Sequence, residues 1–117
     1  MLKFVMVFTY SSASWARMLK VTEDRAAAVK ALIEHFGGSL ESIYWEVETA
    51  SAHVIADLPD SVSAAAVITA ATKTGAFKAV ETHQLLTQKQ LLDMLALAKD
   101  TAEVFEVPGE QDCGLWS

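Results

Sequence analysis

Residues 39–58 read SLESIYWEVETASAHVIADL, and this stretch decides the fold that the sequence predicts. It contains two β-rich segments, residues 39–47 and about 52–58, joined by a short link that has neither glycine nor proline. Two strands this close in the chain pair as antiparallel neighbours. Because side chains alternate along a strand, the first segment is expected to present two faces. One face would carry Glu41, Ile43, Trp45 and Val47, and the other Leu40, Ser42, Tyr44 and Glu46.

Two further β-rich segments lie outside this pair. Residues 2–10 carry apolar side chains on both faces, as a central strand does. Residues 77–85 form the fourth strand, and a helix is predicted on each side of the central pair. The order strand, helix, strand, strand, helix, strand predicts an α+β, ferredoxin-like βαββαβ domain with a four-stranded antiparallel sheet. Right-handed crossovers then place the first and third strands at its centre and the main helices on one face.

Capping residues set the expected ends of the helices. Thr22 is the expected cap of the first main helix, which Gly37 and Gly38 end. Asp60 is the expected cap of an alanine-rich helix over residues 61–74. A short helix before them spaces Trp15, Met18 and Leu19 on one side.

The C-terminal part follows a different pattern. Thr87 and Gln90 match a capping box, which predicts a last helix that extends to about Ala102. From residue 106 the chain loses periodicity and gains proline and glycine. The sequence therefore predicts one domain over residues 1–105 and an irregular tail over residues 106–117.

Composition limits the classes of partner. The chain has 117 residues and a formal charge of −6, and lysine and arginine do not cluster in any one segment. Nucleic acid is therefore an unexpected partner. The apolar runs are far shorter than the ~20 residues that span a bilayer, and the one cysteine, Cys113, cannot form an internal disulfide. We expect a cytoplasmic protein without membrane contact.

The apolar content predicts self-association. Hydrophobic residues make up 52% of the chain, and several strands are apolar on the face that the helices leave uncovered. The sequence therefore predicts that a second copy packs on this face, as a homodimer or a higher oligomer, to give a dimeric α/β barrel.

The sequence also resembles the GYD-domain family of bacterial proteins between about Lys3 and Met94. The matching features are the spacing of Tyr10, Trp15 and Met18, the run EDRAAAVKALIEHFGGSLESIYW, and the run ADLPDSVSAAAVITAATKTGAFKAVETHQLLT. The Gly-Glu-Tyr-Asp signature of the family would fall at Glu48, Thr49, Ala50 and Ser51, so none of its four residues is retained. The resemblance implies a dimeric α/β barrel, a group that includes cofactor-free monooxygenases, haem-degrading enzymes, lactone isomerases and ligand-binding proteins. A fold of this kind does not choose among them.

Two histidines are the candidates for acid–base chemistry. His53 and His83 lie on predicted strands that would hold them rigidly, and imidazole titrates near neutral pH. Glu81 lies two residues before His83, on the same predicted face, so the two could act as a proton-transfer pair. If the first strand separates the histidines, they lie ~9.5 Å apart, too far to share one metal ion directly. A purely structural role is the alternative for all three.

Four aromatic residues are the candidates for ligand binding. Tyr10, Trp15, Tyr44 and Trp45 are expected near one end of the sheet. Such rings suit a flat apolar ligand, and core or dimer packing is the alternative. No cofactor or metal site is predicted, because the sequence has no glycine-rich phosphate loop and no closely spaced histidine and cysteine set.

Three functions remain open at this point. The first is a homo-oligomeric module that binds a small apolar or aromatic metabolite. The second is a cofactor-independent monooxygenase, isomerase or cyclase that uses His53, His83 and Glu81. The third is a structural protein that assembles only with itself. The abundance of packing residues favours the first.

Overall fold

The computed structural model describes residues 1–99 and 108. The chain divides into two compact units, residues 1–85 and 86–117. The elements of the first unit are β1 (Leu2–Tyr10), α1 (Ser12–Lys20), α2 (Arg25–His35), β2 (Ser39–Glu46), β3 (Ser51–Leu58), α3 (Ser61–Lys73) and β4 (Phe77–Leu85).

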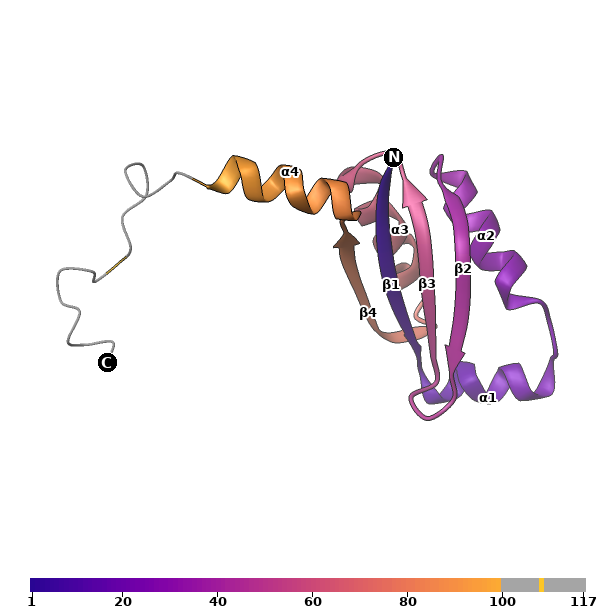
Figure 1. Ribbon diagram of the computed structural model, residues 1–117. Coiled ribbons are helices and arrows are strands. Elements are labelled where there is room, and N and C mark those ends of the chain that lie inside the picture. Colours follow the sequence, from indigo (N-terminus) through magenta and orange to yellow (C-terminus); the bar gives the residue numbers. More distant parts are fainter. Residues whose placement is uncertain (100–107, 109–117) are drawn as a thin grey trace. The chain divides into compact units, whose positions relative to one another are not determined.

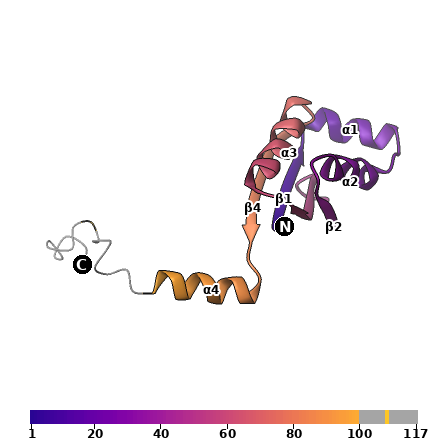
Figure 2. The same ribbon diagram turned by 90° about the horizontal axis from the view of Figure 1, so that it is seen from above.

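The four strands form one antiparallel sheet in the order β2-β3-β1-β4 (Figure 1). The first and third strands lie at the centre, which confirms the predicted arrangement. The unit is therefore an α+β domain with the ferredoxin-like order of elements. Its helices α2 and α3 fill the two crossovers (Figure 2).

The hydrophobic core lies between one face of the sheet and these helices. We call this face of the sheet the helix face and the opposite one the open face. Met6 of β1, Ile33 of α2 and Val67 of α3 are fully buried in the core. Apolar side chains that alternate along β1 and β3 supply the sheet side of it, namely Phe4, Met6, Phe8, Tyr10, Ala52, Val54, Ala56 and Leu58.

A β-bulge in β2 changes the predicted alternation of its side chains. The register shifts between Leu40 and Ser42, so that Leu40 pairs with Ala56 and Ser42 with Ile55. Two consecutive residues then oppose one residue of the partner strand, which moves the residues before the bulge to the other face. Leu40 consequently packs against the core together with Ile43, whereas the prediction placed the two on opposite faces.

The helix ends follow the predicted chemistry with one correction. Asp24, and not Thr22, caps α2, because its carboxylate accepts a hydrogen bond from the Ala27 backbone N–H at 3.1 Å. Asp60 caps α3 as predicted and accepts from the Ser63 N–H at 2.7 Å. This hydrogen bond lowers the pKa of the Asp60 carboxyl.

The second unit contains α4 (Gln88–Ala98). Thr87 and Gln90 form the predicted capping box at its start. The predicted extension to Ala102 and the predicted boundary at residue 106 lie outside the described residues. Within residues 1–99, no helix is both long and apolar enough to cross a bilayer.

Candidate functional site

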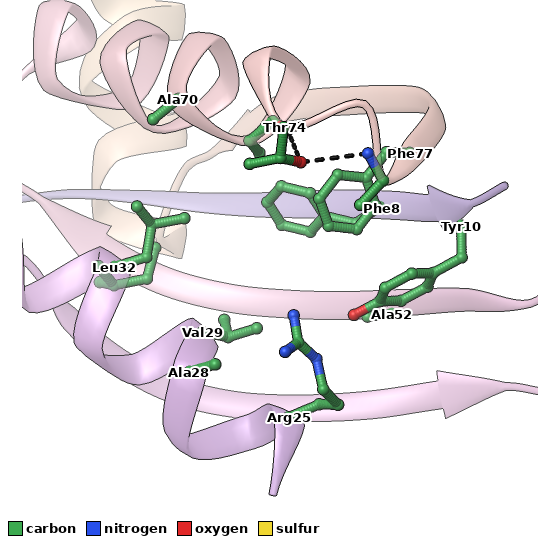
Figure 3. A pocket seen from close by; sticks show the side chains of 13 residues that line it. Phe8, Tyr10, Arg25, Ala28, Val29, Leu32, Ala52, Ala70, Thr74 and Phe77 are labelled. Atoms are coloured by element: carbon green, nitrogen blue, oxygen red, sulfur yellow. Dashed lines mark hydrogen bonds between the residues drawn. The ribbon is translucent and has the colours of Figure 1, made fainter. Parts of the chain in front are cut away.

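An apolar pocket of about 220 Å³ lies between the helix face of the sheet and helices α2 and α3 (Figure 3). Phe8, Tyr10 and Phe77 contribute rings to its wall, and α2 contributes branched side chains. The remaining apolar wall is made by alanines, whose small side chains leave the space open. They are Ala28, Ala52, Ala70, Ala71 and Ala76. We call this space the inner pocket.

Three polar residues line the inner pocket, and two of them carry unsatisfied groups. The Thr74 hydroxyl donates to the Ala71 carbonyl oxygen at 2.7 Å and accepts from the Ala76 N–H at 3.2 Å. The hydroxyl of Tyr10 and the Nε of Arg25 are buried and have no hydrogen-bond partner among the described residues. Figure 3 shows both side chains pointing into the pocket. Because buried polar groups are nearly always paired, these two indicate a place for a polar group of a ligand.

The backbone explains how these two side chains meet. Tyr10 is the last residue of β1, where alternation turns its ring to the helix face and leaves it 3% exposed. Arg25 is the first residue of α2, directly after the cap Asp24. Among residues 1–99, the nearest acidic partner of Arg25 is Glu23, at a distance of 3.8 Å from Nη1 to Oε1. The described residues thus neutralise the guanidinium only loosely.

A second, outer pocket of about 320 Å³ adjoins the first. Tyr10, Arg25 and Ala76 line both pockets. The outer pocket is also lined by Arg17 and Lys20 from the end of α1 and by Glu23, so its wall has three cationic side chains and one anionic side chain. An apolar space and a positively charged space therefore share a wall at Tyr10 and Arg25.

Three of the four predicted ligand-binding aromatics come together beside the pockets. The ring of Tyr10 lies 6.1 Å from that of Trp15 and 6.2 Å from that of Trp45. Phe77, which was not predicted, lies closer still, at 4.8 Å from Tyr10. Tyr44 lies apart, because it pairs with His53 in the sheet and points to the open face, where it is 67% exposed.

The predicted acid–base residues all lie on the open face. His53 Nε2 lies 2.7 Å from Glu46 Oε1, and His83 Nε2 lies 3.4 Å from Glu81 Oε2. Val7 of β1 pairs with His53 on one side and with Glu81 on the other, so β1 separates the two histidines as expected. These groups therefore lie on the side of the sheet away from the inner pocket.

Comparison with known proteins identifies the family. The family model described as GYD domain matches residues 4–95. The chain belongs to the GYD-domain family. No curated protein matches the chain. A solved structure of an uncharacterized NIPSNAP domain protein from Burkholderia xenovorans is similar to this GYD domain at 13% sequence identity, with a TM-score of 0.47, over 74% of this chain and 94% of that chain.

The turn between β2 and β3 lies next to Tyr10. The backbone N–H of Tyr10 donates to the Ala50 carbonyl oxygen at 2.9 Å. Ala50 has a φ of 56°, a left-handed conformation that is uncommon for a residue other than glycine. The turn between β2 and β3 thus positions the end of β1, and with it the wall that both pockets share.

Arg25, like Phe77, is a site residue that the sequence did not predict. The sequence does hold a signal for Arg25, namely its position in the first turn of a helix. A cation is unfavourable there because it lies at the positive end of the helix dipole. A capping interpretation that starts the helix at Thr22 puts Glu23 and Asp24 in that turn and hides the anomaly. Within the described residues, no group of three or more histidine, cysteine, aspartate or glutamate side chains could hold a metal ion.

Proposed function

We propose that this GYD-domain protein is a cytoplasmic homo-oligomer that binds a small, largely apolar or aromatic metabolite in the inner pocket. The observation that carries the proposal is the apolar space of about 220 Å³ that the sheet, α2 and α3 line. An apolar protein cavity of ~150 Å³ is known to hold benzene. The inner pocket is therefore large enough for one or two fused rings.

The composition of the wall supports an aromatic occupant. Phe8 and Phe77 lie in contact with each other, with ring centroids 5.3 Å apart, and Phe77 also contacts Tyr10. Aromatic rings prefer tilted or offset contacts with other rings, which these side chains can offer to a flat ligand. The location of His53, His83 and Glu81 on the open face favours binding over proton transfer as the role of this pocket.

The proposal is tested by titrating the full chain with indole, a neutral bicyclic probe, in a calorimeter. Ala70 lines the inner pocket from α3, so Ala70→Leu should fill part of the space and abolish binding. Ala65 lies exposed on the same helix, so Ala65→Leu should leave binding unchanged. If neither indole nor naphthalene binds the unmodified protein, the proposed function is wrong.

The open face supports the homo-oligomeric part of the proposal. Val5 and Val7 of β1 and Ile55 of β3 form an apolar centre that is only half-buried within residues 1–85. Residues of both charges surround it, including Lys3 and Glu81. A twofold pairing of this face would bury the apolar centre and could bring opposite charges together.

Native mass spectrometry over a wide range of protein concentration tests this pairing. We expect a dimer or a larger multiple. Val5→Glu should shift the population to monomer, because the substitution places a carboxylate at the apolar centre of both copies. Val62→Glu, at an exposed position of α3, is the matched control and should leave the oligomer intact. A monomer at every concentration would overturn the oligomeric part alone.

A further inference from the structure

The inner and outer pockets share a wall at Tyr10, Arg25 and Ala76. The chemistry of this shared wall indicates which class of apolar metabolite binds. Tyr10 is 97% buried, and its hydroxyl has no hydrogen-bond partner among the described residues. The Nε of Arg25 is also buried and has no hydrogen-bond partner among them. Burying polar groups without partners is costly, so the protein gains when a ligand supplies the missing hydrogen bonds. The ligand therefore needs a polar group at this wall.

The two side chains select the chemistry of that group. A guanidinium has only donors, and its planar fork matches the two oxygens of a carboxylate. The Tyr10 hydroxyl can donate to the same acceptor. A group that accepts several hydrogen bonds and carries negative charge is thus favoured over an amide or an alcohol.

The surrounding charge indicates a single negative charge on the ligand. The chain as a whole is acidic, with a formal charge of −6, yet Arg17, Lys20 and Arg25 all line the outer pocket. One acidic residue, Glu23, also lines the outer pocket and lies 3.8 Å from Arg25, so the lining is positive overall. Of the three cations only Arg25 also lines the inner pocket. A single carboxylate at the shared wall therefore matches the one cation that borders the apolar space.

We infer that the ligand is an aromatic or otherwise apolar monocarboxylic acid. Its apolar body occupies the inner pocket, and its carboxylate lies at the shared wall, where it accepts hydrogen bonds from the Arg25 guanidinium and the Tyr10 hydroxyl. This inference rests on the proposed function, because it needs the inner pocket to hold an apolar body.

Matched acid and amide probes test the inference in the full chain. The probes are 2-naphthoate with 2-naphthamide and benzoate with benzamide, titrated by calorimetry at neutral pH. Each pair has nearly the same shape and differs in charge. A hydrogen bond to a charged group is worth roughly tenfold or more in affinity, so we expect each acid to bind about tenfold more tightly than its amide.

Two substitutions assign this preference to the shared wall. Arg25→Met and Tyr10→Phe should each weaken binding of the acid much more than binding of the amide, and so remove most of the preference for the acid. Lys30→Met, at an exposed position of the same helix α2, is the matched control and should keep the preference. Tyr10→Phe retains the ring and deletes an unpaired buried hydroxyl, so the ligand-free variant should be at least as stable as the parent protein.

The outcomes separate the inference from the proposed function. Equal affinities for acid and amide would overturn the inference while the pocket stands as a binding site. An acid preference that survives Arg25→Met would also overturn it, because the charge would then be recognised elsewhere. Binding of none of the four probes would overturn the inference, and it would overturn the proposed function as well if indole and naphthalene also fail to bind.

Discussion

The two faces of the four-stranded sheet are built from the same strands and differ in chemistry. The side chains on the helix face of β1 are each 5% exposed or less, namely Phe4, Met6, Phe8 and Tyr10. On the open face of β1, Lys3, Val5, Val7 and Thr9 are half-buried. Alternation along one strand thus separates a closed apolar layer from a mixed surface that remains accessible within residues 1–85.

The polar contacts of the sheet follow the same division. The open face carries hydrogen bonds and ion pairs between strands, such as Lys3 with Glu41 and Asp57, Thr9 with Ser51, and His53 with Glu46. The helix face carries the core and, at one end, the inner pocket. Stability and ligand binding are therefore expected to depend on one face, and association with a second copy on the other.

The largest expected effect contrasts two neighbouring residues of β1. Met6 is fully buried on the helix face, so Met6→Ala should lower the free energy of unfolding by ~2–5 kcal/mol through lost contacts and a cavity. Val7 lies on the open face, and Val7→Ala should cost about 1 kcal/mol or less in the monomer. Urea denaturation of both variants measures the two changes.

Protein concentration sharpens this contrast. If a second copy covers Val7, the free energy of unfolding that Val7→Ala removes should grow with protein concentration. The free energy that Met6→Ala removes should remain larger at every concentration. Equal costs for the two variants in a monomeric sample would contradict the division between the faces.

A smaller effect is expected at two glycines that differ in their surroundings. A Cβ on Gly38 would lie 2.5 Å from the Asp57 carbonyl oxygen and 2.6 Å from Leu58 Cδ2, so the packing of α2 on the sheet would have to shift. We expect Gly38→Ala to cost ~1–3 kcal/mol. Gly75 has a φ of 75° but open space around it, so Gly75→Ala should cost only the ~1 kcal/mol of a left-handed alanine.

Thermal unfolding of both variants checks this order. Both changes add the same methyl group, and only the methyl group at residue 38 meets packed atoms. Gly38→Ala should therefore be the less stable of the two variants. A Gly75→Ala variant that is less stable than Gly38→Ala would show that backbone conformation, and not packing, dominates at these positions.

The elements of the fold were predictable because they depend on local patterns. The runs at residues 2–10 and 77–85 and the caps Asp60 and Thr87 lie in the sequence as short-range signals, and the structure has them. The bulge in β2 was not predictable in this way. Glu41 and Ser42 both reach the open face there, and the partner of Glu41 is Lys3, 38 residues away.

The candidate site was predictable only in part, for a related reason. Tyr10, Trp15 and Trp45 attract attention as large aromatic residues, and the fold brings them together. Arg25 gains its significance only when the start of α2 lies beside the end of β1. An unpaired buried group is a property of the assembled structure, and no spacing in the sequence indicates it.

The smallest expected effect probes the open face by pH. Lys3 Nζ donates to Glu41 Oε2 at 2.6 Å and to Asp57 Oδ2 at 3.4 Å, and these two hydrogen bonds raise the pKa of Lys3 above its ordinary value of 10.5. A raised pKa means that the charged lysine stabilises the folded state at pH values below 10.5, and that this contribution disappears as the pH rises through the higher folded-state pKa. The urea midpoint of the unmodified protein should therefore exceed that of Lys3→Met at pH 8, and the difference should shrink above pH 10.5.

Comparison of the two proteins at each pH cancels the titration of the other lysines and the tyrosines. Because the pair is exposed, the difference at pH 8 should stay well below the effect of Met6→Ala. A difference that does not change with pH would mean that the aliphatic part of Lys3, and not its charge, supports the open face.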